Sequence, residues 1–411
     1  MSRGMKLADV LVIGGGPVGS YVAHELASMA HEVVVLEQKE RLGLEVCCTG
    51  IISQQCVSDF AIDDDIILKR LNSARIFSPS AGLIRLWRPE TQACVVDRAA
   101  LDLAMARRAQ AAGAQYMLAC PVKRIEVRQD RVVVEVVRHK EKKGFSAKAV
   151  VIASGFNPGL VGSLGLGRIS DFATGAQTEV TTKGIDEVEV YTGREIAPGF
   201  FAWLVSTSPN RAWLGLLSRN RPRLYLNRLI SSLMAQGKIT QAGEGLKCRH
   251  LPLRTLPRTY GDRLVVVGDA AGQVKPTTGG GIYYGLLSAR LAAQSLHRAL
   301  VKNDLSDRSL ASYQRGWQEK LGQDIRLGYL ARRFYQLLGD RQLDKIFDIL
   351  KKNGIVEALL KEDDLSFDEH GRVILSLARQ RFLGKIAEVI KIPFQKSTDR
   401  ADADRGYPKG D

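Results

Sequence analysis

The chain has 411 residues, of which 45% are hydrophobic and 25% charged, and its formal net charge is +15. This composition is typical of a globular protein, and the length allows a large core and two or more structural units. The positive charge favours an acidic partner, such as phosphate groups, an anionic membrane, an acidic carrier protein or nucleic acid, but a solvated basic surface explains it equally well. We expect no nucleic-acid partner, because the sequence has no nucleic-acid-binding motif and no basic block interleaved with aromatic residues.

The six cysteines form no C-x-x-C pair, so zinc and iron–sulfur ligation are not expected and no metal site is predicted. The first strand pattern starts close to the N-terminus, which leaves no room for a signal peptide. No uncharged apolar stretch is long enough to span a bilayer. We therefore expect a cytoplasmic, reducing location, with any membrane contact made from the surface.

The first elements in chain order are a buried strand over 9–13, a helix over 20–30 and a second strand over 33–36 that ends at Glu37. The first strand leads directly into the run 14–19, which has the pattern G-x-G-x-x-G. Strand, glycines, helix, strand and acid in this order predict a dinucleotide site. A glycine-rich turn in some other α/β domain is the alternative.

Each residue of this pattern has a physical task in such a site. Gly14 allows a tight turn, Gly16 lets the backbone approach a pyrophosphate, and Gly19 lets helix and strand pack closely. The free amides at the helix start favour negative charge. Glu37 is placed to accept hydrogen bonds from both ribose hydroxyls of an adenosine.

Periodicity and turn residues predict the elements that follow. In chain order these are a loop over the cofactor at 43–50, a helix over 51–60, a strand or hairpin at 74–87, a helix over 99–112, strands within 114–137, a charged turn at 138–143 and a buried strand at 150–152. Strands at 188–191, 200–204 and 212–216 predict an antiparallel sheet with an aromatic face. This face could line a substrate cavity or form an ordinary aromatic core.

A second strand–loop–helix arrangement follows a helix over 224–234. It combines a strand at 263–267 with a helix from 282 to about 300. Asp269 could accept a hydrogen bond from a ribityl hydroxyl, and the amides of 279–282 could face a pyrophosphate or a flavin ring. The rest of the chain is predicted to be helical, with apolar stripes that are more typical of a core than of lipid contacts.

Together these motifs resemble the FAD-dependent geranylgeranyl reductase family, within the larger class shaped like p-hydroxybenzoate hydroxylase. The resemblance covers about residues 8–300, and the run TTGGGIYYGLL at 277–287 is its most specific part. It implies an α/β fold with a Rossmann-like FAD-binding domain of the p-hydroxybenzoate hydroxylase and glutathione reductase type, an antiparallel-sheet substrate domain and a C-terminal helical region. The predicted boundaries are 1–72, 94–170 and 255–300 for the first domain, 73–93 and 171–254 for the second, 301–395 for the helical region, and 396–411 for a disordered tail.

The resemblance also implies a set of FAD contacts. They are Gly14, Gly16, Pro17, Val18, Gly19, Glu37, Cys48, Thr49, Gly50, Arg98, Val122, Asp269, Gly279, Gly280, Gly281 and Ile282. Without its neighbours Arg98 would be interpreted as part of a surface Arg–Asp pair. The loop 46–50 is one residue shorter than the family's cysteine loop, and Cys47 stands where an Arg is common.

The substrate side departs from the family pattern P-x-x-Y-x-W-x-F-P. At 198–206 Phe201 replaces the Tyr, Trp203 is retained, and Val205-Ser206 replace the final Phe-Pro. Phe201 and Trp203 are the predicted substrate-pocket residues. The pocket is expected to stay apolar, but this change leaves the identity of the lipid open.

The resemblance implies a reductase that saturates isolated double bonds of prenyl chains of the geranylgeranyl type, on a lipid or a diphosphate, by hydride from reduced FAD plus protonation. Cys48 is the candidate catalytic residue, with a buried loop cysteine as the alternative. No second dinucleotide fingerprint is present, so either NAD(P)H docks transiently or a ferredoxin-like protein supplies the electrons. The basic charge would suit an acidic ferredoxin, lipid phosphates or a peripheral contact with an anionic membrane.

Two other functions fit the same fold. One is an aromatic monooxygenase, and the other is a flavin electron carrier or redox sensor. A halogenase would show a W-x-W-x-I-P motif, which the sequence lacks. A quinone-linked dehydrogenase would add a cysteine cluster for iron–sulfur, which is also missing from the sequence.

Overall fold

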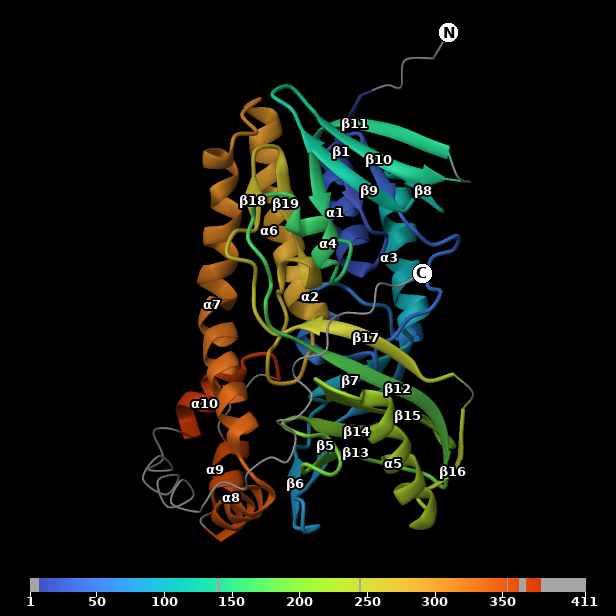
Figure 1. Cartoon of the computed structure of the whole chain (residues 1–411), viewed down its shortest axis with the longest axis vertical. Coiled ribbons are helices and arrows are strands. Elements are labelled where there is room, and N and C mark those ends of the chain that lie inside the picture. Colours follow the sequence, from blue (N-terminus) through green and yellow to red (C-terminus); the bar gives the residue numbers. More distant parts are fainter. Residues whose placement is uncertain (1–6, 139–140, 244, 353, 362–366, 378–411) are drawn as a thin grey trace.

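The computed structural model describes residues 7–138, 141–243, 245–352, 354–361 and 367–377. Two large sheets occupy the two ends of the long axis, and helix α7 (Asp307–Leu337) runs along one side of both (Figure 1). The predicted α/β fold class is confirmed. The domain boundaries proposed from the sequence stay a prediction.

The upper sheet is the predicted nucleotide-binding sheet. Its strands run in the order β18 (Tyr260–Gly261), β19 (Leu264–Val266), β11 (Glu141–Ile152), β1 (Ala8–Ile13), β2 (Val33–Leu36) and β8 (Gln115–Met117), with β9 (Val122–Val127) and β10 (Val132–Arg138) attached through β11. Neighbours from β19 to β8 are parallel. Val10 and Val12 of β1 belong to one core, and Leu11 and Ile13 belong to the other. Burial on both faces explains the unbroken apolar runs of the sequence.

Three helices cover one face of this sheet. Helix α1 (Pro17–Ser28) packs against α3 (Arg98–Ala111) and α6 (Ile282–Val301). Helix α1 begins three residues before the predicted start, because proline is favoured at the first position of a helix and Gly16 is the N-cap. It ends before Ala30, whose φ of 62° is incompatible with a right-handed helix.

The predicted helix over 51–60 is wrong in its first turn. Residues Ile51–Ser53 form strand β3, which pairs with β7 (Ala93–Val96), and β7 pairs with β4 (Ile67–Leu71). Two β-branched isoleucines suit a strand, and Ser53 then caps helix α2 (Gln54–Asp59) by accepting a hydrogen bond from the Cys56 amide. The result is a separate three-stranded sheet.

The lower sheet has the predicted hairpin and aromatic strands. Its order is β16 (Ile239–Ala242), β12 (Phe172–Thr182), β15 (Arg211–Ser218), β14 (Phe201–Ser208), β13 (Val188–Thr192), β5 (Ser73–Phe77) and β6 (Leu83–Trp87), with β17 (Lys247–Pro252) also paired to β12. All pairs are antiparallel except β5 with β13, which are parallel because a long connection returns the chain to this sheet. Helix α5 (Pro222–Ala235) packs on β12 and β15.

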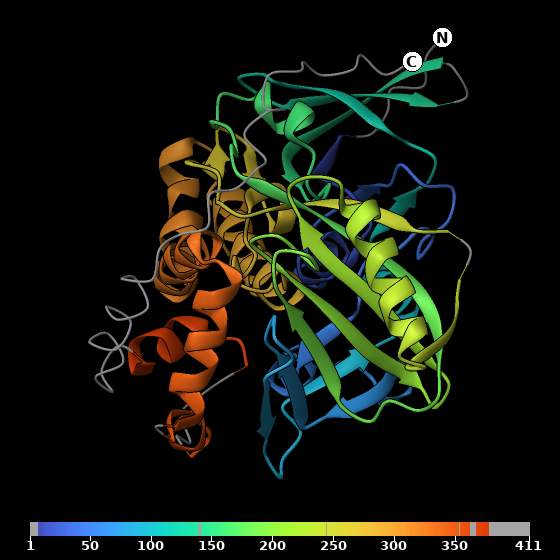
Figure 2. The ribbon, with the colours of Figure 1, turned by 60° about the horizontal axis from the view of Figure 1, so that its bottom comes forward.

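The C-terminal helices lie beside the lower sheet (Figure 2). They are α8 (Asp340–Lys352), α9 (Ile355–Leu360) and α10 (His370–Leu377), and α10 packs against α7. The first predicted apolar stripe is core, since Leu343, Ile346 and Leu350 pack in one cluster with Ile355. The end of the second stripe and the predicted tail at 396–411 lie outside the described residues.

No helix among the described segments is long and apolar enough to cross a membrane.

Candidate functional site

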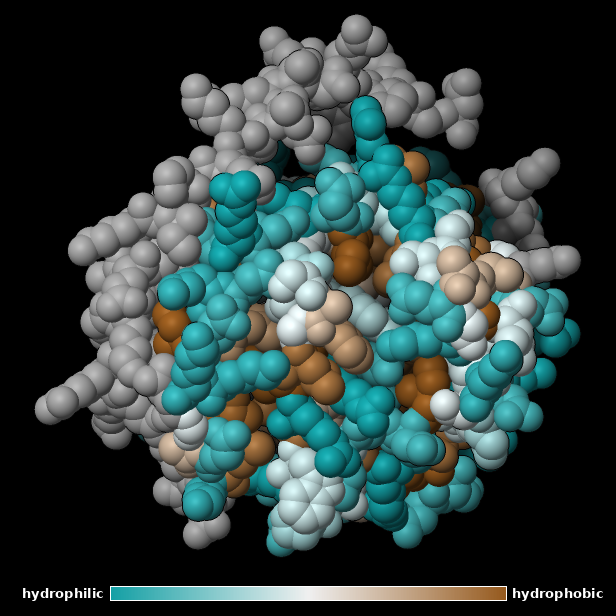
Figure 3. All heavy atoms as spheres, turned by 90° about the horizontal axis from the view of Figure 1, so that it is seen from below, coloured by the Kyte–Doolittle hydropathy of each residue, from teal (hydrophilic) through white to brown (hydrophobic). Residues whose placement is uncertain are grey.

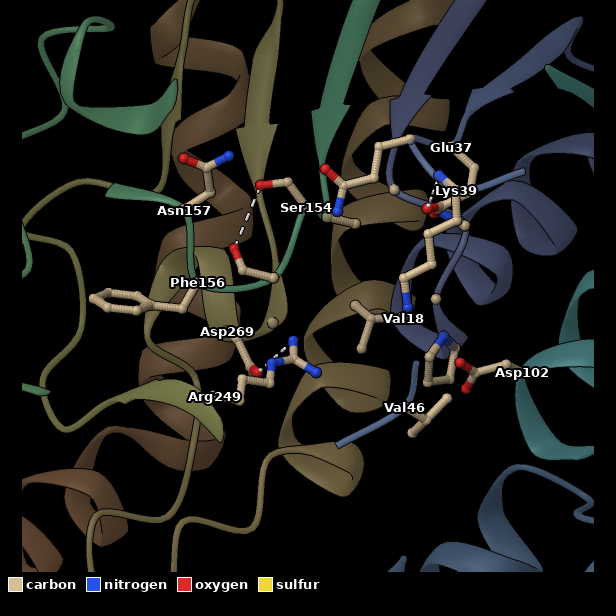
Figure 4. Close-up of a pocket in the computed structure, with 18 of the residues that line it drawn as sticks. Val18, Glu37, Lys39, Val46, Asp102, Ser154, Phe156, Asn157, Arg249 and Asp269 are labelled. Atoms are coloured by element: carbon tan, nitrogen blue, oxygen red, sulfur yellow. Dashed lines mark hydrogen bonds and ion pairs between the residues drawn. The ribbon is translucent and has the colours of Figure 1, made fainter. Parts of the chain in front are cut away.

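A cavity of about 450 Å³ lies where the parallel strands of the upper sheet end. Gly14 follows β1, Glu37 follows β2, Ala153 follows β11 and Val267 follows β19, and all four line the cavity (Figure 4). Open α/β sheets bind ligands at the carboxyl ends of their strands. The cavity is therefore in the position that a nucleotide would occupy.

The glycines at the start of α1 have different surroundings. A Cβ on Gly14 would lie 2.4 Å from the Ala153 carbonyl oxygen, and a Cβ on Gly19 would lie 2.0 Å from the Gly14 carbonyl oxygen. A Cβ on Gly16 would meet no atom within 4 Å. No side chain caps the N-terminus of α1. Gly14 and Gly19 thus serve close packing, whereas Gly16 leaves open space in front of amides that favour an anion.

Glu37 is held in a fixed orientation at one end of the cavity. One carboxylate oxygen accepts a hydrogen bond from the Gly15 amide at 2.6 Å, and the other accepts from the Lys39 amide at 2.9 Å. Glu37 is only 8% exposed. Each carboxylate oxygen can accept two hydrogen bonds, so this residue keeps the capacity to bind two ribose hydroxyls.

Two segments build the other end of the cavity. One is the second strand–loop–helix unit, from β19 to α6, and the other is the loop at 46–50, which we call the cysteine loop. Gly281 is the N-cap of α6, again without a side-chain cap, so a second helix N-terminus has free amides. Asp269 lies against this turn, since a Cβ on Gly281 would be 2.7 Å from its Oδ1. Val46 and Cys48 line the cavity from the cysteine loop, and Figure 4 shows Val46 across the cavity from Asp269.

Arg249 of β17 reaches the cavity, which the sequence did not indicate. Its guanidinium lies 3.4 Å from Asp269 Oδ2 and close to Gly155. The Asp269 carboxylate raises the pKa of Arg249. The residue brings a permanent positive charge to the end of the cavity opposite Glu37.

Arg98 does not form a surface pair. It donates from Nη2 to Asp102 Oδ1 at 2.7 Å, both side chains are nearly buried, and both residues line the cavity. Asp97 instead caps α3 by accepting hydrogen bonds from the Ala99 and Ala100 amides. Burial raises the pKa of Asp102 despite the nearby guanidinium.

Four cysteines from three segments line the cavity: Cys47, Cys48, Cys120 and Cys248. All four are free thiols. Burial raises the pKa of Cys47 to about 11, so this thiol keeps its proton at neutral pH. Neither Cys120 nor Cys248 was predicted as a site residue from the sequence, and Cys248 reaches the cavity because β17 pairs with β12.

The structure brings most of the predicted cofactor residues together. Those that line the cavity are Gly14, Gly16, Pro17, Val18, Glu37, Cys48, Arg98, Val122, Asp269, Gly279, Gly281 and Ile282. Gly19, Thr49, Gly50 and Gly280 are not among the lining residues. The roles of both groups as FAD contacts stay predictions.

The two predicted substrate residues do not line this cavity. By register, Phe201, Trp203, Gly215 and Gln177 share one face of the lower sheet. The indole of Trp203 covers Gly215, where a Cβ would lie 2.5 Å from Trp203 Cζ2. Thr49 of the cysteine loop donates to Gln177 Oε1 at 3.2 Å. This aromatic face is therefore bonded directly to the loop that lines the cavity.

Comparisons with known proteins agree with this geometry. Residues 8–190 match the family described as pyridine nucleotide-disulphide oxidoreductase. A digeranylgeranylglycerophospholipid reductase from Methanocaldococcus jannaschii is 28% identical over 356 residues, which are 83% of this chain and 90% of that protein.

Two solved structures show how widely the fold is shared. A geranylgeranyl bacteriochlorophyll reductase-like protein from Thermoplasma acidophilum has a TM-score of 0.82 at 24% identity, over 94% of this chain and all of that chain. A p-nitrophenol 4-monooxygenase from Pseudomonas putida has a TM-score of 0.65 at 18% identity, over 86% of this chain and 96% of that chain. The chain is therefore an oxidoreductase with the FAD-binding fold, and its predicted resemblance to the geranylgeranyl reductases is confirmed.

Proposed function

We propose that this protein is an FAD-dependent reductase that saturates isolated double bonds of geranylgeranyl-type prenyl chains, carried on a lipid or a diphosphate. The observation that carries the proposal is the cavity with an uncapped helix N-terminus at each end and the buried carboxylate of Glu37 beside one of them. Phosphates and a ribose are the groups that such a site binds. The similarity to the digeranylgeranylglycerophospholipid reductase of Methanocaldococcus jannaschii supports the choice of substrate.

The residues fit the two halves of FAD. Glu37 would bind the adenosine ribose, the amides at the start of α1 would bind the pyrophosphate, and Val122 would meet the adenine. Asp269 would accept hydrogen bonds from the ribityl chain. The ring would lie between the cysteine loop and the glycines at 279–281, with Arg98 along the cofactor. When bound, reduced FAD supplies hydride to one carbon of the alkene.

The protein's own residues would hold the alkene in an apolar environment and supply a proton to its second carbon. Phe201 and Trp203 lie on the sheet face that packs against Leu71 and Val95 of the three-stranded sheet. The lower surface of the molecule has apolar side chains in hollows between polar ones (Figure 3), which suits the entry of a prenyl chain. Cys48 is our candidate for the group nearest the reacting carbons.

We further propose that electrons come from NAD(P)H or from a ferredoxin-like protein, and that an anionic membrane is met peripherally. The net charge of +15 supports an acidic protein or lipid phosphates as partners. Stopped-flow reduction of the flavin by NADH, NADPH and reduced ferredoxin, each supplied alone, identifies the donor.

The test is an anaerobic assay with dithionite as reductant and a geranylgeranyl lipid as substrate. Mass spectrometry should show gains of two hydrogens per reduced double bond, and the Glu37→Ala variant should lose them along with the flavin. Oxygen consumption stimulated by an aromatic substrate would instead indicate a monooxygenase. Reduction of the flavin without product from either substrate class would indicate an electron carrier or redox sensor, and both outcomes contradict the proposal.

A further inference from the structure

A short segment near the C-terminus is bonded to the glycine-rich loop of the cavity. Lys275, at the start of this loop, donates from Nζ to Asp368 Oδ1 at 2.6 Å and to the Phe367 carbonyl oxygen at 3.2 Å. The side chains of Lys275 and Asp368 are only 5% and 3% exposed. The ammonium group also lies 4.6 Å from the centre of the Phe367 ring, which adds a cation–π contact.

The same segment contacts the residues that follow the loop. Tyr284, in the first turn of α6, is buried and donates its hydroxyl to the Asp368 carbonyl oxygen at 2.9 Å. Inside the loop, the Lys275 amide donates to the Gly280 carbonyl oxygen at 3.0 Å, and the Gly279 amide donates to the Lys275 carbonyl oxygen at 2.8 Å. Asp368 is thus bonded to the loop on both sides of its glycines.

This arrangement determines the position of the loop. Breaking a buried ion pair by removing one partner is costly, because the remaining charge is left without compensation. Moving Lys275 away from Asp368 is therefore energetically costly. Its aliphatic chain also packs under Gly280, since its Cε lies 3.5 Å from the position of a Gly280 Cβ. Asp368 therefore holds the Lys275 side chain in contact with Gly280.

We infer that Asp368 is a positioning residue that sets the geometry of the flavin-ring half of the cofactor site through Lys275 and Tyr284. This inference rests on the proposed function, in which residues 279–282 contact the ring. It also assigns part of the cofactor site to the C-terminal region, which lies outside both sheets. The adenosine half is built by other segments, the turn after β1 and Glu37, so the two halves should respond differently to a change at Asp368.

The experiment compares the binding of FAD and of ADP, which carries only the adenosine and pyrophosphate half. We expect Asp368→Asn to raise the Kd for FAD about tenfold or more, a factor that corresponds to about 1.4 kcal/mol, with less than about a twofold change for ADP. The absorption spectrum of bound FAD should also shift, because the surroundings of the ring change. Asp368→Glu, which keeps the charge, should recover part of the FAD affinity.

Two further variants keep the result interpretable. Glu369→Gln is the matched control, because Glu369 pairs with Arg372 in the same segment and both side chains are partly exposed. It should leave both affinities unchanged. Tyr284→Phe removes only the hydroxyl that bonds to the Asp368 carbonyl oxygen, so it should weaken FAD binding less than Asp368→Asn does. This variant tests the same contact if Asp368→Asn does not fold.

The possible failures are distinguishable. If the wild-type protein binds neither FAD nor ADP, the proposed function fails. If the wild type binds both and Asp368→Asn retains its FAD affinity, only the positioning role is refuted. Equal weakening of FAD and ADP would also refute it, since that pattern indicates a general loss of stability.

Discussion

The open space in front of Gly16 allows cofactor binding to be separated from folding. In the structure a Cβ on Gly16 would meet no atom within 4 Å, and its φ of −71° is accessible to any residue. Gly16→Ala should therefore fold, and its free energy of unfolding without cofactor should rise by about 0.4–1 kcal/mol, because alanine reduces the entropy of the unfolded chain. The methyl group would, however, project into the space proposed for the pyrophosphate.

The cost to binding follows from the hydrogen bonds that the methyl group would prevent. Losing one hydrogen bond to a charged phosphate costs about 1.5–3 kcal/mol, which corresponds to roughly ten- to hundredfold weaker binding of FAD. Flavin fluorescence titration measures this affinity, and thermal unfolding of the apoprotein measures the stability. Gly19→Ala is the matched comparison, because its Cβ would lie 2.0 Å from the Gly14 carbonyl oxygen and should destabilise the fold itself. Unchanged FAD affinity in Gly16→Ala would refute our placement of the pyrophosphate.

Three further predictions follow from particular contacts. Glu37→Gln keeps only one acceptor oxygen for the Gly15 and Lys39 amides, so ADP binding measured by calorimetry should weaken about tenfold; undiminished binding would contradict the role of the carboxylate. Gly215→Ala should displace the Trp203 indole and slow the reduction of a prenyl lipid, while the Kd for FAD stays within about twofold. An unchanged rate would contradict our assignment of Trp203 to the substrate pocket. Burial opposes ionisation of Asp344, but hydrogen bonds from Ser78 and Ser80 outweigh it and lower its pKa. The stability that Asp344 contributes is therefore present above its ordinary pKa of 3.8 and is lost as the pH falls through the lower folded value. The difference in thermal midpoint between wild type and Asp344→Asn should shrink below that pH, and a constant difference would argue against this linkage.

The residues at the Glu37 end of the cavity could be brought together from the sequence because their signals are local. The apolar run, the three glycines and Glu37 lie within about thirty residues, and each has a geometric reason for its place. The same reasoning misplaced the start of α1, where Pro17 already begins the helix. It also missed β3, because a three-residue strand is recognisable only from its partner β7.

The opposite end of the cavity depends on contacts between distant segments. Arg249 and Cys248 reach it because β17 pairs with β12, and neither residue stands in a motif. Asp102 lies one turn after Arg98 on α3, and this i, i+4 spacing was the one signal that could have identified it. Asp368 follows Lys275 by 93 residues, so nothing in the local sequence marks the pair.

The structure also changes how the net charge of +15 should be interpreted. Part of this charge is internal. Arg332 is 3% exposed, donates to the Gly199 carbonyl oxygen and lies 3.4 Å from the centre of the Phe200 ring. Burial lowers the pKa of Arg332 to about 9, so it still carries its charge at neutral pH. Arg98 and Lys275 are also inside the protein, but each is paired with a carboxylate, so these two pairs add nothing to the net charge. Buried charges of this kind cannot contact a partner directly, so the attraction of an acidic donor or membrane must come from exposed residues, such as the arginines of α5.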